Sequence, residues 1–407
     1  MNIVLHKLQG GSRGHYQLLA GLALMLVLGV SALLYIEHHG HIVTGMNNQF
    51  VWGLPDVFSI FLMLSGPGAL SVALLASVFG KVEYEPVAPL SGLLAIALVF
   101  TGLMLLMLDL GRPDRASQAM LHFNPKSVLS WNLYLYSGFM GFVGAYLWSL
   151  MEPGMRRFTP WAIGLAFAWR IGLTTGTGSI YGFQVARQGF DSAIFAPMYI
   201  ALSLSYGLAV FVLVLLLACR SNSIPLGDAL MARLARLQVI FIGVGLYFVV
   251  IHHMTNYYFT RNRDFERFIL LEGGIYTNLF WFGQILLGTL VPLALLLKPG
   301  IAQMRGRIVA SVALVVLGAF AQLYVTILGG QAQPLPLFPG RQVSSSFFDG
   351  IVNSYTPSLP EWGMGLLALA LLGLVVTLAL RLMAFLPQRL DDAALQKYLA
   401  KQALSAT

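Results

Sequence analysis

The sequence contains few charged residues. Asp, Glu, Lys and Arg make up 10% of its 407 residues, against about a quarter in an ordinary soluble domain. Hydrophobic residues make up 57%. This composition excludes an ordinary soluble protein and predicts an integral membrane protein in contact with lipid. The net charge of +8 is typical of a bacterial membrane protein with basic inner loops, so it indicates no nucleic-acid partner.

Cysteine is almost absent. Cys219 is the single cysteine of the chain, which excludes a disulfide framework, a cysteine-ligated iron–sulfur cluster and a structural zinc site within this chain. Any metal cofactor must therefore be held by histidine or lie in a partner protein, and we expect no metal site in this chain.

Long apolar runs dominate the rest of the sequence. They predict an all-α integral membrane protein with ten transmembrane helices. The first run follows Lys7 and Arg13 and is followed by no small-residue cleavage site, so we interpret it as a retained span. The predicted spans are 16–36, 55–79, 89–109, 130–151, 158–182, 193–219, 237–259, 274–297, 308–328 and 362–386.

The distribution of Lys and Arg predicts the orientation. Ten spans place both termini on one side, and fifteen of the 24 basic residues fall on that side. The positive-inside rule makes that side cytoplasmic. The expected location is therefore the bacterial inner membrane, with a multi-pass chain and both termini in the cytoplasm.

A short internal similarity predicts the helix grouping. The stretch "NLYLYSGFMGF" (132–142) resembles "NLFWFGQILLG" (278–288), four spans later. This spacing predicts two parallel four-helix bundles, spans 2–5 and 6–9, flanked by spans 1 and 10. The chain is then one transmembrane domain, 1–407, with these parts: 16–54 first span and outer loop, 55–192 first repeat, 193–328 second repeat, 329–361 outer loop, and 362–407 last span and cytoplasmic tail. The composition of 329–361 favours a packed cap or a docking surface.

Titratable residues collect toward the predicted outer side. Six of the eight histidines lie there, and His252 and His253 fall inside a span. Ionisable groups at membrane depth are costly and mark proton or ligand pathways. Quinone chemistry needs such groups, because it moves two protons with two electrons and requires an acid or base near each carbonyl oxygen. The acid/base candidates are His39, Asp56, His252, His253 and Glu272, and aromatic ring contacts are available from Trp52 and Tyr257.

Two other interpretations of these residues stay open. Histidine, tyrosine and tryptophan near span ends also serve as interfacial anchors. A haem b group between transmembrane histidines is the other, but the inner halves of the spans lack histidine, which disfavours a two-haem relay.

One arginine lies in the middle of a predicted span. Arg170 precedes the polar stretch "TTGTGS", so it is either a member of a proton path or the structural partner of an inward acid, with Asp109 as the candidate. Asp109 itself is the second candidate for proton transfer.

The stretch "LDLGRPDRASQAMLHFNPKSVLSWN" (108–132) resembles the signature of the NrfD/PsrC family, the membrane subunits of polysulfide-reductase-type complexes. In that family an Asp-Leu-Gly-Arg-Pro-x-Arg run is followed by Asn-Pro-x-Ser and Trp. The matching positions are Asp109, Leu110, Gly111, Arg112, Pro113, Arg115, Asn124, Pro125, Ser127 and Trp131. Further similarity in 264–283 and 354–362 is to a ten-helix branch that includes the hydrogenase-2-type subunit HybB and the sulfite-reductase-linked subunit DsrP.

The resemblance implies a haem-free subunit with two four-helix bundles and a menaquinone or ubiquinone site near the outer face of the first bundle. The family's contacts cannot be matched residue by residue in the span that begins at 55, so Asp56 and Ser59 are our own candidates for quinone contacts there. The resemblance also implies that a ferredoxin-like iron–sulfur subunit docks on the outer face and exchanges electrons with the quinone, within a larger respiratory complex. The sulfite-reductase-linked member of the branch favours a role in sulfur metabolism. Arg112, Asp114 and Arg115 are then a docking and loop-fixing cluster.

The sequence thus predicts a quinone-interacting subunit of a membrane-bound oxidoreductase complex that does not act as an enzyme alone. Two alternatives are a secondary transporter or channel-like protein, which needs a site at the membrane midplane, and a purely structural anchor.

Overall fold

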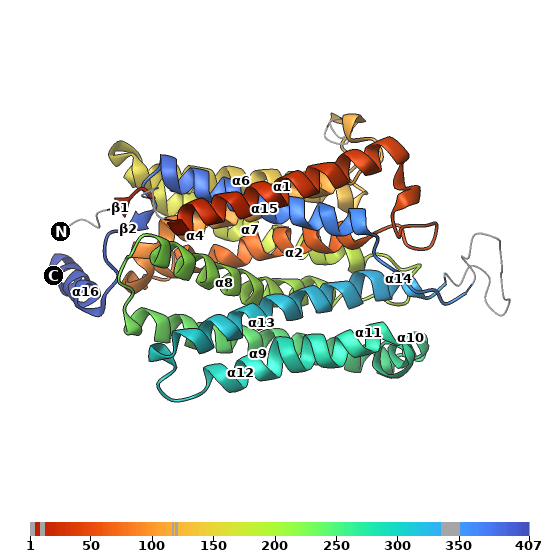
Figure 1. The fold of residues 1–407 in the computed structure, drawn as a ribbon. Helices are drawn as coiled ribbons and strands as arrows, with labels where there is room; N and C mark the ends of the chain where they lie inside the picture. Colours follow the sequence, from red (N-terminus) through yellow and green to blue (C-terminus); the bar gives the residue numbers. More distant parts are fainter. Residues whose placement is uncertain (1–4, 9–12, 116–117, 119–120, 335–350, 407) are drawn as a thin grey trace.

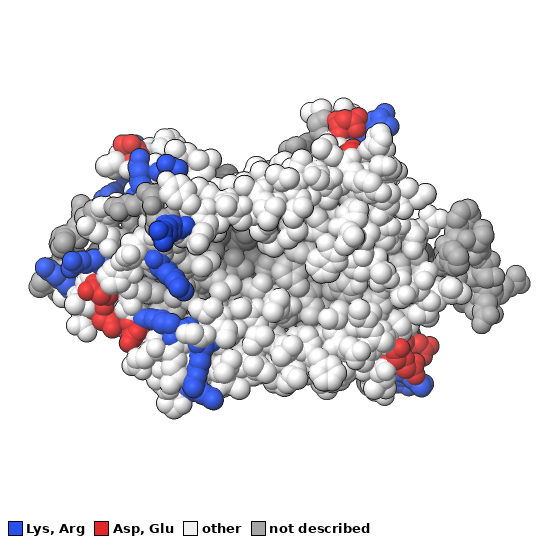
Figure 2. Space-filling view, viewed as in Figure 1, with Lys and Arg blue, Asp and Glu red and all other residues white. Residues whose placement is uncertain are grey.

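The computed structural model describes residues 5–8, 13–115, 118, 121–334 and 351–406. It is an elongated bundle of long helices (Figure 1). The strands β1 (Leu5–His6) and β2 (Leu386–Pro387) pair antiparallel at one end of the bundle, where helix α16 (Asp392–Ala406) also lies. Most Lys and Arg side chains on the face drawn in Figure 2 gather at this end, which we call the basic end.

The long helices lie where the apolar runs predict them. Their bounds are α1 Arg13–His39, α2 Leu54–Ala69 with α3 Ser71–Ser77, α4 Ala88–Leu108, α6 Val128–Met151, α7 Thr159–Gly182, α8 Phe195–Ser221, α9 Asp228–Tyr258, α11 Ile275–Asn278 with η6 Leu279–Leu290 and α12 Val291–Leu296, α13 Arg305–Tyr324 with η8 Val325–Gly329 and α14 Gly330–Ala332, and α15 Leu359–Leu382.

Short elements connect them. These are η1 His41–Val43, η2 Val82–Val87, η3 Pro113–Arg115, η4 Pro153–Phe158, α10 Arg263–Arg267, η5 Phe268–Glu272 and η7 Ile301–Gln303.

Within the described residues, eight helical segments are long and apolar enough to cross a membrane, so this is a multi-pass membrane protein. The other two long helices, α6 and α7, are 24 residues each. They are less apolar because Trp, Tyr, Thr and Gly interrupt their hydrophobic residues.

Helix α2 is the centre of the packing. All of its 16 residues are buried, and it contacts α4, α8, α13 and α15. The helix begins at Leu54, where the Gly53 N–H donates a hydrogen bond to Asp56 Oδ2 at 2.9 Å. Pro67 lies inside the helix and the regular structure breaks after Ala69, because proline removes a backbone donor and crowds the preceding turn.

The remaining helices pack around this centre in two groups. Helices α4, α6 and α7 join α2 on one side, and α8, α9, α13 and the α11–η6–α12 segment form the other group. Helices α1 and α15 pack along each other, and α15 lies against α2 and α4. The first and last long helices are therefore a pair on one flank, rather than one at each end.

The predicted outer loop 329–361 differs from the structure at its start. Residues 329–332 are helical, in η8 and α14, since the apolar run continues through them. The prediction of a packed cap falls largely on 335–350, which lie outside the described residues. In the described part, Tyr355 is buried at 3% exposure.

Glycines allow α2 and α8 to approach closely. A Cβ atom on Gly68 would lie 1.6 Å from the Ser203 backbone oxygen, and one on Gly207 would lie 2.1 Å from the Ala69 nitrogen. Small residues at such crossings let helix backbones pack together in lipid, where van der Waals contact is a main source of association.

We therefore expect Gly207→Ala to lower the thermal unfolding midpoint in detergent, since overpacking costs about 1–3 kcal/mol. The matched control is Gly164→Ala on α7, where an added Cβ meets nothing within 4 Å. Equal midpoints for the two variants, measured by intrinsic fluorescence during heating, would contradict this packing.

Candidate functional site

A cavity of about 280 Å³ lies among α2, α4, α6 and α7. Its lining residues come from the start of α2 and α6 and the end of α4 and α7, so it lies toward the bundle end opposite the basic end. Its lining is mostly apolar, from Ile60, Met63 and a row of leucines on α4 and α6. The polar lining residues are Trp52, Asp56, Asn132, Tyr136 and Tyr181. A largely apolar cavity with a few converging polar groups is the usual form of a small-molecule site, though this volume is at the lower edge of the range of roughly 300–1,000 Å³.

Asp56 is the acid in this cavity. It is 7% exposed, and its Oδ2 atom accepts the hydrogen bond from the Gly53 N–H. Asp109, which follows the last residue of α4, has a buried Oδ1 atom with no hydrogen-bond partner in the described chain. Burial, and then the negative charges of Asp56 and Glu361, raise the pKa of the Asp109 carboxyl. A raised carboxyl pKa favours the protonated acid near neutral pH.

Two polar side chains of α6 complete the cavity wall. Asn132 Nδ2 donates hydrogen bonds to the Val128 and Gly176 backbone oxygens at 2.9 and 3.0 Å. Its Oδ1 atom is buried and has no hydrogen-bond partner among the described residues. One helical turn later, the Tyr136 hydroxyl lies 2.9 Å from Thr177 Oγ1. Because Thr177 Oγ1 donates its own proton to the Leu173 backbone oxygen, Tyr136 is the donor in this contact. The cavity wall therefore offers two hydrogen-bond acceptors, Asn132 Oδ1 and the Tyr136 hydroxyl oxygen.

The loop before α2 positions Trp52 at the cavity. Gln331 on α14 binds this loop through its amide: Oε1 accepts from the Val51 and Trp52 N–H groups at 2.8 and 3.1 Å, and Nε2 donates to the Trp52 carbonyl at 3.1 Å. The Trp52 ring packs against Tyr181 and Phe190 at centroid distances of 5.4 and 5.9 Å.

Residues from α15 and the preceding segment hold the same loop. The Leu54 N–H donates to the Tyr355 hydroxyl at 2.7 Å, and the Tyr355 hydroxyl donates to Glu361. Glu361 also accepts from the Gly45 N–H at 3.0 Å. The cavity of one helix group is thus shaped by segments much later in the chain.

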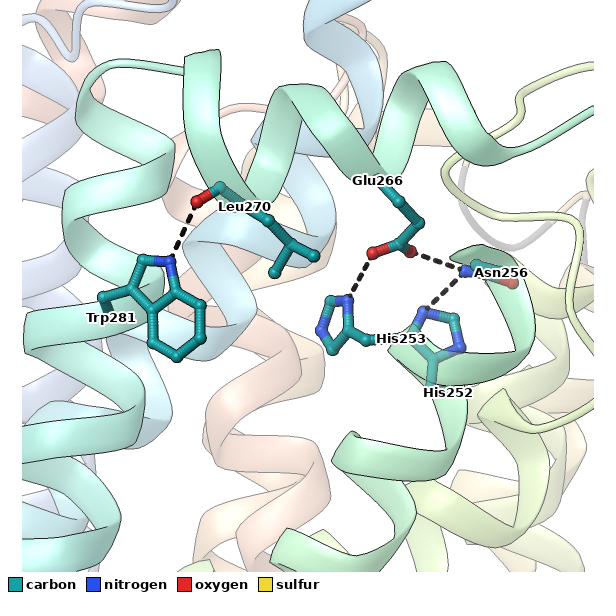
Figure 3. A network of polar contacts seen from close by, with 6 residues as sticks. All are labelled: His252, His253, Asn256, Glu266, Leu270 and Trp281. Carbon is teal, nitrogen blue, oxygen red and sulfur yellow. Dashed lines mark hydrogen bonds and ion pairs between the residues drawn. The ribbon is translucent and has the colours of Figure 1, made fainter. Parts of the chain in front are cut away.

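A second polar cluster lies in the other helix group (Figure 3). His253 Nδ1 lies 2.8 Å from Glu266 Oε2, and Asn256 Nδ2 donates to Glu266 Oε1 at 3.0 Å. Asn256 Nδ2 also lies 3.2 Å from His252 Nε2. Glu266 is fully buried, and the cavity beside the histidines has a volume of only about 20 Å³. That space holds about one water molecule and no aromatic ring.

The structure brings together some of the residues proposed from the sequence. Trp52 and Asp56 line the large cavity. Ser59 is fully buried one turn along α2, with no partner for its Oγ atom among the described residues, and Asp109 lies at the end of α4 beside the cavity.

The other proposed residues lie elsewhere. His252 and His253 form the second cluster. His39 and Tyr257 are exposed, and His39 Nδ1 lies 3.0 Å from the Tyr35 backbone oxygen of its own helix. Glu272 is exposed and pairs with Arg267 at 2.7 Å.

Arg170 is buried on α7 but does not line the large cavity. Its proposed pairing with Asp109 is absent among the described ion pairs, because Arg170 lies in mid-helix while Asp109 lies at a helix end. Arg112 and Asp114 form an exposed pair at 3.4 Å, and no cluster of three His, Cys, Asp or Glu suited to a metal occurs in the described ranges.

Sequence reasoning missed Asn132, Tyr136 and Tyr181. A signal for two of them was present, because Asn132 and Tyr136 are four residues apart and so share one face of an otherwise apolar helix. Gln331 and Glu361 were also missed. Their role depends on contacts between segments about 280 and 316 residues apart in the chain.

Comparison with known proteins gives one family and several full-length relatives. Relatives include the Hdr-like menaquinol oxidoreductase integral membrane subunit of Archaeoglobus fulgidus, 27% identical over 98% of this chain and 100% of that protein. A putative dimethyl sulfoxide reductase membrane protein of Halobacterium salinarum is 26% identical over 92% of both chains. A selenate reductase component of Mesobacillus selenatarsenatis is 23% identical over 88% of this chain and 90% of its own length.

The family model for polysulphide reductase, NrfD, matches residues 42–335. This range contains the Asp109–Trp131 signature, the large cavity and the histidine cluster. The chain belongs to the NrfD polysulphide reductase family.

Proposed function

We propose that this chain is the quinone-interacting membrane subunit of a respiratory oxidoreductase complex, and that the 280 Å³ cavity is its quinone site. The observation that carries the proposal is an apolar cavity between helices with Asp56, Asn132 and Tyr136 in its wall. The relative from Archaeoglobus fulgidus is named a menaquinol oxidoreductase subunit, which supports menaquinone as the quinone. The family assignment favours this function over the transporter alternative.

The cavity wall fits a quinone head group. The leucines and methionines of α2, α4 and α6 provide apolar surface for a ring, and the Trp52 and Tyr181 rings lie at one side. The unused Asn132 Oδ1 acceptor and the Tyr136 hydroxyl oxygen suit the hydroxyl groups of a quinol, because the Tyr136 proton is donated to Thr177 Oγ1, whose own proton goes to the Leu173 backbone oxygen. A bound quinol supplies two electrons and two protons.

Asp56 is the proposed proton acceptor. A carboxylate in the wall of a dry cavity is positioned to accept a proton from a ligand hydroxyl, and its link to the Gly53 N–H holds the oxygen in place. The nearby Asp109 carboxyl, with its unpartnered oxygen, is the proposed next group toward the aqueous surface.

The finer architecture belongs to the same proposal. We place α6 and α7 in the membrane with the other eight, giving ten spans in two four-helix groups with α1 and α15 on one flank. The basic end is then cytoplasmic and the cavity lies toward the outer face. A ferredoxin-like iron–sulfur subunit is the proposed electron partner at that face, because the chain has one cysteine and no cluster ligands of its own. Sulfur chemistry as the terminal reaction stays a prediction.

Asp56→Asn should lower quinol-oxidation turnover of the assembled complex by about 10²–10⁴-fold, because the amide cannot accept the proton. Menaquinol oxidation with an artificial electron acceptor measures it. Asp264→Asn, an exposed acid of α10, is the matched control and should retain wild-type turnover. Equal turnover in both variants would show that Asp56 takes no proton in the reaction.

Leu133→Trp should abolish quinone binding, because the added ring occupies the cavity that Leu133 lines. Binding of a menaquinone analogue to the purified protein, followed by calorimetry, measures this. Leu165→Trp on the exposed surface of α7 is the control for added bulk. If the Leu133 variant is folded, with the thermal midpoint of the control, and still binds the analogue, the quinone site lies elsewhere.

A further inference from the structure

The second helix group contains two small cavities in series. One, of about 20 Å³, lies beside His252 and His253. The other, of about 30 Å³, is lined by residues that include Ser205 and Tyr206. Val249, Gln284 and Gln322 line both, so the two cavities adjoin. A polar cavity of about 10–15 Å³ or more can hold a water molecule.

Buried polar atoms along these cavities lack protein partners. The Gln284 side chain is 5% exposed, lines both cavities, and its amide has no hydrogen bond among the described residues. His252 lines the smaller cavity, and its Nδ1 atom is buried with no partner in the described chain. Gln238 Oε1 is also buried without a described partner; Gln238 lines neither cavity, but its Nε2 atom donates to Ser205, which lines the larger one. Buried polar groups almost always have partners, and internal water supplies them where protein does not.

Direct hydrogen bonds between side chains continue the line of buried polar groups away from the histidines. The Tyr206 hydroxyl donates to Gln322 Oε1 at 2.5 Å. Gln238 Nε2 donates to Ser205 Oγ at 3.0 Å. Gln238 and His252 are fourteen residues apart on α9, or roughly 21 Å along the helix axis at 1.5 Å per residue.

The backbone is irregular beside the same cavities. The π-helical segments of the described chain, η5, η6 and η8, all lie in this part of the molecule. Each contributes lining residues: Ile269 from η5, Gln284 from η6 and Thr326 from η8. π-Helical turns occur frequently at functional sites, and here they widen the helices where the unpartnered Gln284 amide faces the cavities.

We propose that these two cavities hold a short file of internal water, which conducts protons between the His253–Glu266 pair and the Tyr206–Gln322 pair and is separate from the large cavity of the other helix group. Protons move by hopping: each water accepts a hydrogen on one lone pair and releases another to its neighbour. The Gln284 and Gln322 amides, which line both cavities, orient the waters and take no proton.

The His253–Glu266 pair is the end at which protons enter or leave (Figure 3). Glu266 is fully buried, whereas the His253 side chain is 19% exposed, and their 2.8 Å contact joins a buried acid to a more accessible base. Asn256 holds the other Glu266 oxygen and His252 Nε2, so the acid is kept in this position.

Water occupancy can be tested on the purified protein by X-ray hydroxyl-radical footprinting, which modifies side chains beside bound water. Met198 and Tyr206 line the cavities, and we expect both to be modified although they are buried. Met231 and Tyr146 are also buried, line neither cavity, and should stay unmodified. Equal modification within each matched pair would overturn the proposal.

Proton access can be tested by transfer into D₂O, with the Tyr206 O–H band isolated by infrared subtraction of a Tyr206→Phe spectrum. We expect Tyr206 to exchange readily in the wild type and to lose that exchange in Gln284→Met, which keeps the side-chain length and removes the amide. Gln184→Met at the end of α7 is the control. A Tyr206 hydroxyl that stays unexchanged in the wild type, or exchanges equally in Gln284→Met, would refute proton conduction. Neither measurement depends on quinone turnover.

Discussion

The complete burial of helix α2 is the constraint on which the rest of the structure depends. Its backbone lies against α8 at Gly68 and Gly207, where no side chain fits between them. This crossing joins the two helix groups. Since α2 also carries Asp56 in its first turn, the packing that joins the groups places the acid in the cavity wall.

Long-range hydrogen bonds hold the loop that precedes α2. The Gln331 amide accepts a hydrogen bond from the Val51 N–H and donates one to the Trp52 carbonyl. Glu361 accepts from the Gly45 N–H, and the Tyr355 hydroxyl accepts from the Leu54 N–H. These donors and acceptors come from the last quarter of the chain, so the cavity is complete only when the whole chain has folded. The large cavity and the two small cavities beside Gln284 and Gln322 belong to different helix groups. The proposed quinone site, with its own acid Asp56, and the proposed water file therefore lie in separate parts of one protein.

Much of the fold follows from local properties of the sequence. Apolar runs predict helices such as α8 and α15 nearly to their ends, because length and hydropathy decide them. The break after Ala69 follows from Pro67. The helix grouping around α2, and the pairing of α1 with α15, depend on side-chain fit and are not visible in hydropathy. The sequence identified Trp52 and Asp56 as site candidates. It also grouped His39, Tyr257 and Glu272 with them, because residue type and membrane depth do not show which helix faces meet. Asn132 and Gln331 were missed for the same reason.

Photolabelling with an azido-menaquinone tests the central claim most directly. After illumination of the wild-type protein, the site of attachment is located by peptide mass spectrometry. The proposed site predicts attachment to the cavity wall, within 52–63 of α2 and its preceding loop or within 129–136 of α6, and its suppression by excess unlabelled menaquinone. Competable attachment at His252 or His253 instead, with none in the cavity wall, would contradict the account.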